Sequence, residues 1–119
     1  RLGGAWVWLQ NATGAGSGWS TTGNSGVVFG TNYLGTRDNN PLVFGLNGAF
    51  AGGMGIRNNI GLGRGAGYLS YESTGANNIA IGDSAMYHNT TGTKNIAIGT
   101  QALKSNLLGL NNIAIGDSD

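Results

Sequence analysis

A five-residue block that recurs at a fixed interval constrains this sequence more than any other feature. Asn-Ile-Ala-Ile-Gly begins at Asn78, at Asn95 and at Asn112, so the step is 17 residues both times. A degenerate copy begins 19 residues earlier, at Asn59. Self-similarity at a fixed period is the signature of an architecture of stacked units. We therefore interpret residues 58–119 as about four copies of one structural unit.

Each Ile-Ala-Ile block predicts a short β-strand. Its period-2 alternation and β-branched isoleucines favour a strand, and the glycine that follows favours a turn. The Asn-, Thr- and Gly-rich segment 89–94 predicts a second turn. One unit is then a strand, a turn, a short extended piece (Ala85–Tyr87) and a turn, which is one coil of a β-solenoid.

A single coil is too small to be stable alone. It has about four sizeable apolar side chains, each worth roughly 1.5–3 kcal/mol when fully buried. Ordering its backbone costs roughly 1–2 kcal/mol per residue. Stacking at about 4.8 Å per coil pairs the backbones. It also places asparagines of one frame position in a possible hydrogen-bonded ladder. Because the core stays thin and small alanines allow close approach, we expect the Ala face to be covered by another chain.

Residues 1–57 lack the period and contain all tryptophans and phenylalanines of the chain, so we interpret them as a small, aromatic-containing, irregular β module. Apolar runs predict strands at 5–9, 26–29 and 41–44, and turn-forming residues predict loops at 11–18 and 36–40. No helical periodicity of useful length is present.

The composition excludes several functions. Charged residues make up 9% of the chain and the net charge is +1, which argues against nucleic-acid binding. The chain has no cysteine, so it has no disulfide and no thiolate-bound zinc. No run of residues approaches the length of a membrane span. The chain starts without a Met or a signal-like segment, so we expect a fragment whose targeting and anchoring segments lie elsewhere.

The Asn-Ile-Ala-Ile-Gly blocks, with Ala-Met or Ala-Leu a few residues later, resemble YadA-like head repeats of trimeric autotransporter adhesins and repeats of phage tail fibres. Segments 19–24 and 33–44 resemble a module that precedes such repeats, so the resemblance covers about residues 19–119. It implies a homotrimer of left-handed parallel β-rolls. It also implies an extracellular location, on a bacterial surface or a virion tail fibre. The implied partners are a host or cell-surface receptor, a matrix protein or a glycan.

The resemblance also implies roles for particular residues. The first copy departs from the pattern, since Gly61 stands in the Ala position. The side chains implied to fill the coil core are Ile60, Leu62, Ile79, Ile81, Ile96, Ile98, Ile113 and Ile115. Those implied to face neighbouring subunits of the trimer are Ala80, Ala97 and Ala114.

Other motifs are better explained as structure. The glycine-rich segment 61–67 is not followed by the strand–helix unit that phosphate binding requires, so it predicts coil turns. His88 is the single histidine, and the neighbouring Asp83–Ser84 pair recurs as Asp117–Ser118 without a histidine, which indicates a turn role rather than catalysis. Asp83 and Asp117 stand two coils apart, too far to share a calcium ion, although an ion on an oligomer axis stays open.

The function predicted from the sequence is therefore structural and adhesive attachment, without catalysis, cofactor or metal. The alternative is a carbohydrate-binding module, because aromatic rings offer flat apolar faces to ligands. The residues proposed for that contact are Trp6, Trp8 and Trp19, although such side chains more often form a core or an oligomer interface.

Overall fold

The computed structural model describes residues 25–28, 34–68 and 74–117. The chain forms two compact units, Arg1–Gly35 and Thr36–Asp119. In the first unit the described residues form no strand, so the strand predicted at 26–29 is not found over 26–28. The predicted strand 5–9, the loop 11–18 and the three tryptophans lie outside the described residues.

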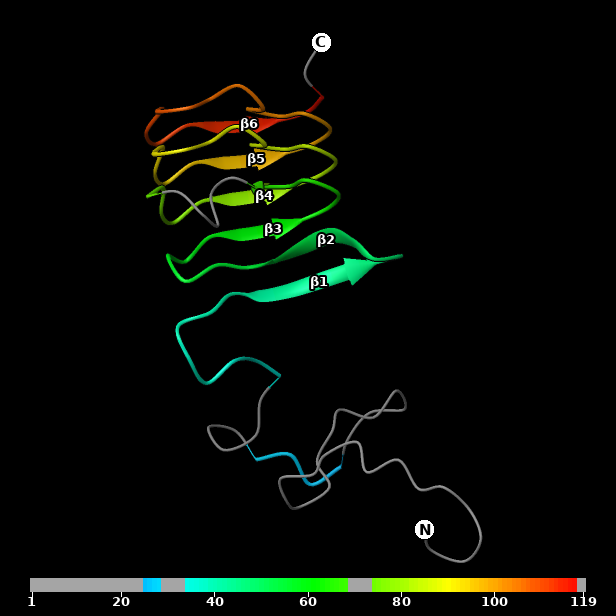
Figure 1. The fold of residues 1–119 in the computed structure, drawn as a ribbon. Helices are drawn as coiled ribbons and strands as arrows, with labels where there is room; N and C mark the ends of the chain where they lie inside the picture. The colour runs from blue at the N-terminus through cyan, green and yellow to red at the C-terminus, as the bar shows by residue number, and fades with distance from the viewer. Residues whose placement is uncertain (1–24, 29–33, 69–73, 118–119) are drawn as a thin grey trace, which may run out of the picture. The chain divides into compact units, whose positions relative to one another are not determined.

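The second unit is built on one six-stranded sheet whose strands follow one another in chain order (Figure 1). Its strands are β1 (Leu42–Leu46), β2 (Ala49–Met54), β3 (Ile60–Leu62), β4 (Ile79–Ile81), β5 (Ile96–Ile98) and β6 (Ile113–Ile115). No α-helix occurs in the described ranges, and the predicted all-β class is confirmed. Since β1 and β2 pair into the sheet of the repeats, the compact unit begins at Thr36 rather than at the expected boundary near Arg57.

The direction of the strands changes at β3. From β3 to β6 neighbouring strands are parallel and in register, so Ile79 lies opposite Ile96, which lies opposite Ile113. The pairs β1–β2 and β2–β3 are antiparallel. Asn47 and Gly48, with φ of 52° and 75°, form the two-residue connection between β1 and β2. Positive φ at both central residues is the requirement of a tight hairpin turn, which Asn-Gly meets well.

After each repeat strand the chain turns and runs back through a return segment, comprising residues 66–68, 85–88 and 102–105 in successive repeats. These segments also bond to one another. The Gly67 N–H donates to Ala85 O (2.8 Å), the Met86 N–H to Ala102 O (2.9 Å) and the His88 N–H to Lys104 O (3.0 Å). Successive repeats are thus joined along the strands and along the return segments.

The core lies between the strands and the return segments, and it corrects the predicted assignment of faces. It consists of small side chains and one methionine: Ala66, Ala80, Ala85, Met86, Ala97 and Ala102. Ala80 and Ala97 are 1% and 0% exposed within a single chain, so they are not available to neighbouring subunits. Ala114, in the last strand, is partly buried and takes the same orientation.

The isoleucines predicted to fill the core instead point outward. Because side chains alternate along a strand, burying the central alanine turns both flanking isoleucines to the other face. The interior that each repeat encloses accommodates methyl groups and Met86 but not an isoleucine column. The same reversal holds in β3, where Gly61 is buried and its neighbours Ile60 and Leu62 are not.

The predicted asparagine ladder is confirmed. Asn59 Oδ1 accepts from the backbone N–H and Nδ2 of Asn78 (3.0 and 3.1 Å), and Asn78 Oδ1 accepts in the same way from Asn95 (2.9 and 3.2 Å). Asn95 Oδ1 accepts from both groups of Asn112 (2.9 and 3.1 Å). Each Nδ2 of the first three also donates to a glycine carbonyl of a turn, which satisfies amides that are almost fully buried.

Candidate functional site

Two surfaces of the second unit are candidates for function. The first is the outer face of the sheet, which we call the strand face. It is apolar over all six strands, and its residues are Leu42, Phe44, Met54, Ile60, Leu62, Ile79, Ile81, Ile96, Ile98, Ile113 and Ile115. These positions are partners in the pairing register, so their side chains stand side by side on one face.

The strand face is incompletely covered by its own chain. Leu62, Ile81 and Ile98 are 45%, 37% and 36% exposed, although they lie in the middle of the sheet. Met54 and Phe44 continue the exposed apolar surface into the antiparallel strands. A contiguous apolar surface of this kind marks an interaction site more often than an isolated exposed leucine does.

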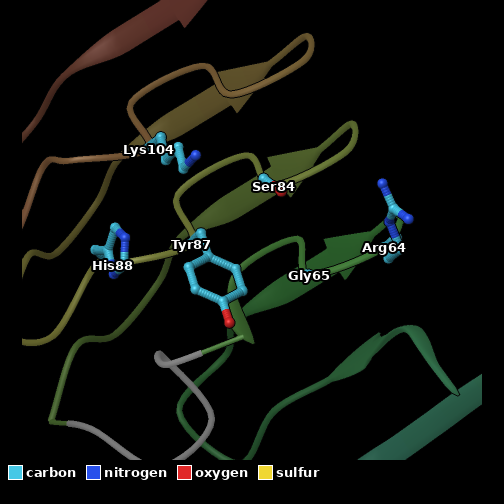
Figure 2. Close-up of a pocket in the computed structure, with 6 residues that line it drawn as sticks. All are labelled: Arg64, Gly65, Ser84, Tyr87, His88 and Lys104. Atoms are coloured by element: carbon cyan, nitrogen blue, oxygen red, sulfur yellow. The ribbon is translucent and has the colours of Figure 1, made fainter.

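The second candidate is a pocket of about 420 Å³ formed by three successive repeats. Its lining residues are Arg64, Gly65, Ser84, Tyr87, His88 and Lys104. Figure 2 shows Tyr87 between His88 and Gly65, with Lys104 above His88 and Tyr87 and with Arg64 farther away beyond Gly65. These residues belong to the turns and return segments, so they lie across the core from the side chains of the strand face.

The repeat frame explains why these residue types meet. Counted from the glycine that ends each strand (Gly63, Gly82 or Gly99), the fifth following residue is Tyr68, Tyr87 or Lys104. Stacking of the repeats therefore makes one column of two aromatic rings followed by an ammonium group. The pocket lies beside this column.

The aromatic side chains of the column contact one another. The rings of Tyr68 and Tyr87 are stacked, with centroids 5.8 Å apart and planes at 12°. Tyr87 also makes an edge contact with His88 at 4.9 Å, and Tyr68 makes one with Phe50 at 5.6 Å. Offset-stacked and edge-to-face pairs at these separations stabilise ring orientations.

One ion pair stands at the rim of the pocket. Arg64 Nε donates to Asp83 Oδ1 at 2.9 Å, between the turns after β3 and β4. This hydrogen bond and the positive charge of Arg64 lower the pKa of the Asp83 carboxyl, and the same hydrogen bond and the negative charge of Asp83 raise the pKa of Arg64. Among the described residues Lys104 forms no such ion pair, although its positive charge also contributes to lowering the pKa of Asp83.

The residues considered for catalysis or metal binding are separately placed. His88 is exposed and lies in a return segment beside Tyr87. Asp83 binds Arg64, while Asp117 Oδ1 accepts the Thr100 N–H at 2.9 Å. In the part of the chain that the structure describes, no three acidic, His or Cys side chains cluster as metal ligands.

The glycine-rich segment 61–67 contributes to β3 and to the turn that follows it, as predicted. Sequence reasoning missed the pocket, because it compared the repeats by their recurring residues. The signal was present in the frame position where the repeats differ, occupied by Tyr68, Tyr87 and Lys104.

No protein-family model, curated protein or solved structure matches this chain. No helix in the described residues is long and apolar enough to span a membrane. The fold and the two surfaces define a class of protein. It is an all-β repeat protein with an exposed apolar sheet face and a separate polar pocket.

Proposed function

We propose that this chain is a structural and adhesive segment of an extracellular fibre, a left-handed parallel β-roll that assembles as a homotrimer and catalyses no reaction. The observation that carries the proposal is the strand face, which is apolar from β1 to β6 and exposed in the single chain. The trimer buries these faces against one another and leaves the pocket on its outside.

The distribution of apolar side chains supports this assembly. The core of one chain is made of alanines and Met86, while the isoleucines lie outside it. Full burial of an isoleucine is worth roughly 1.5–3 kcal/mol. Because the largest aliphatic side chains lie on one face of the chain, most of that free energy is gained only when a partner covers this face. A second copy of the chain presents the same apolar face and can serve as that partner.

Three parts of the proposal rest on the resemblance of the Asn-Ile-Ala-Ile-Gly repeats to YadA-like heads. They are the number of chains in the assembly, the handedness of the roll and the location on a bacterial surface or virion tail fibre. The binding of a host receptor, matrix protein or glycan has the same support. The fold is consistent with these proposals because stacked, in-register repeats make an elongated element that joins distant points.

Light scattering after size exclusion tests the assembly. The native chain is expected at about three times its mass of 12.1 kDa. Ile98→Glu places a charge in the centre of the strand face and is expected to lower the mass to that of one chain. Circular dichroism should show that the repeats stay folded, because Ile98 is not part of the core.

Leu108→Glu is the matched control. Leu108 is also an exposed apolar residue, 66% exposed, but it lies in a turn outside the strand face. Its variant should keep the native mass. A folded native monomer, or an equal loss of mass in both variants, would contradict the strand-face interface. A native mass of two chains would replace the trimer by a dimer and keep the interface.

A further inference from the structure

The pocket combines three chemical groups that suit one kind of ligand. One face of the partly exposed Tyr87 ring stacks on Tyr68, and the face directed away from Tyr68 can pack against the C–H groups of a ligand ring. The Ser84 hydroxyl donates to Asp83 Oδ2 at 3.4 Å, and its oxygen can still accept a hydrogen bond from a ligand. The Lys104 ammonium supplies three donors and a positive charge. A flat apolar contact flanked by hydroxyl and charged partners is typical of a polar ring-shaped ligand.

The charge of the pocket limits the ligand further. Arg64 and Asp83 offset each other in their ion pair, which leaves one positive charge, that of Lys104. A polyanion such as RNA is bound through many cations that replace its counterions, and the chain has only six Lys and Arg residues in total. One free ammonium beside an aromatic ring instead matches a ligand unit with one carboxylate or sulfate.

The shape of the pocket depends on a glycine. Gly65 occupies the frame position held by Ser84 and Gln101 in the next repeats. A Cβ atom at Gly65 would approach Tyr87 Cδ2 to 2.9 Å, so a side chain there would displace the ring. The absence of a side chain leaves the hollow open beside Tyr87. Its volume of about 420 Å³ falls in the range of small-molecule sites.

The pocket stays accessible when the strand faces are covered. Ala85 and Met86 are buried in the core against the strands, and Tyr87 and His88 follow them on the same return segment. The pocket and the strand face are therefore separate surfaces of one chain. A ligand that binds the pocket need not compete with assembly.

We infer that this pocket binds an acidic sugar unit, a pyranose ring carrying a carboxylate or sulfate. Tyr87 contacts the apolar face of the ring, Lys104 pairs with the anionic group and Ser84 bonds to a hydroxyl. The inference rests on the proposed function only in taking attachment as the role of the site. All of the residues belong to a single chain, so the site does not require the oligomer.

Titration calorimetry or ligand-observed NMR with defined oligosaccharides tests the inference. The probes are sialyllactose and a sulfated lactose, with uncharged lactose as the reference. We expect both acidic sugars to bind at least about tenfold more tightly than lactose, and the preference to shrink as salt is raised. Lys104→Gln should remove this preference. Sialyllactose binding without sulfated lactose binding identifies the carboxylate as the anionic group, and the reverse result identifies the sulfate.

Lys94→Gln is the matched control, because it makes the same charge change at an exposed turn residue outside the pocket. It should bind like the native chain. Tyr87→Ala should weaken binding of all three sugars, whereas Tyr87→Phe keeps the ring and should retain binding if the ring face is the contact. Equal binding of lactose and acidic sugars, equal effects of both lysine variants, or no binding by the folded native chain would overturn the inference. The sugar-binding results and the mass measured by light scattering are independent of each other. Failure of the proposed sugar site can therefore be distinguished from failure of the proposed assembly.

Discussion

The repeats from β4 to β6 and the start of the sheet from β1 to β3 build the same outer surface by different means. In the repeats, identical spacing stacks identical residues, so alanine faces alanine inside and isoleucine faces isoleucine outside. In the start, the positions in register with these alanines are the buried glycines Gly53 and Gly61 and, in β1, Val43, which is 52% exposed, and the strands run antiparallel. The outer face is apolar in both regions.

This difference distinguishes the structural features that depend on the repeat period from the apolar outer surface, which does not depend on it. The period provides parallel register, the asparagine ladder and the alanine core. The outer face continues through Phe44 and Met54, which lie outside the repeats, and through Leu62 of the degenerate first copy. An apolar surface that persists when the repeat pattern is lost is consistent with a role of its own, which is the role in assembly proposed above.

The largest effect is expected from Ala97→Glu, which introduces a charge into the core of the repeats. Ala97 is 0% exposed, and an uncompensated buried charge costs about 3–5 kcal/mol. We expect loss of cooperative thermal unfolding by circular dichroism over β4–β6. The Ile98→Glu variant carries its charge on the outer face of the same strand. It should unfold at a temperature close to the unfolding temperature of the unassembled native chain. If Ala97→Glu stays folded and only lowers the assembly mass, the two faces of β5 are assigned wrongly.

A smaller but clear effect is expected from Asn95→Ala, which removes one member of the ladder. The change leaves the Asn112 N–H and the Gly109 carbonyl without their side-chain partners, and each buried polar group without a partner costs about 1–3 kcal/mol. Urea unfolding should show a corresponding drop in the free energy of unfolding. Asn39→Ala, the same change at an exposed residue before β1, should change it little. Similar losses for both would show that the ladder contributes nothing specific.

The smallest effect concerns the joint between the two regions, where Arg64 after β3 binds Asp83 after β4. The pKa of Asp83 is lowered from its ordinary value of 3.8, so the pair stabilises the fold above that pH and the stabilisation is lost as pH falls below it. Thermal unfolding should therefore be less sensitive to acid below about pH 4 in Asp83→Asn than in the native chain. Identical acid sensitivity would mean that the pair does not stabilise the joint.

Much of the fold could be predicted from the recurrence of one motif. The spacing of Asn78, Asn95 and Asn112 located the repeat strands and the ladder, because identical frame positions in stacked units must face one another. The departure from the pattern at Gly61 lies in β3, which pairs antiparallel with β2 and parallel with β4, but the sequence did not predict this change of direction. The Asn47-Gly48 hairpin was missed, although Asn-Gly between apolar runs is a strong hairpin signal.

The side of the strand that faces inward could not be derived from alternation alone. Alternation places Ile79 and Ile81 opposite Ala80 but does not say which face is enclosed. The assignment of the isoleucines to the core was carried over from the resemblance to YadA-like repeats. The structure settles the choice, because Ala80 and Ala97 belong to the same buried cluster as Ala85 and Met86 of the return segments. The pocket required the same knowledge of how the return segments stack.

The 19-residue interval between the first two copies shows where this architecture tolerates a change of length. The frame is shared up to Tyr68 and Tyr87 and again from Gly75 and Gly92 onward, so the two extra residues fall between Tyr68 and Gly75. On either side the register is intact, as the bonds from Gly67 to Ala85 and from Gly75 to Thr90 show. Insertions at this point leave every ladder aligned, whereas insertions within a strand or return segment would displace all of them. Evolution can therefore change the length of the chain at this point, and lengthen the element by whole repeats of about 4.8 Å each, without redesigning its interior.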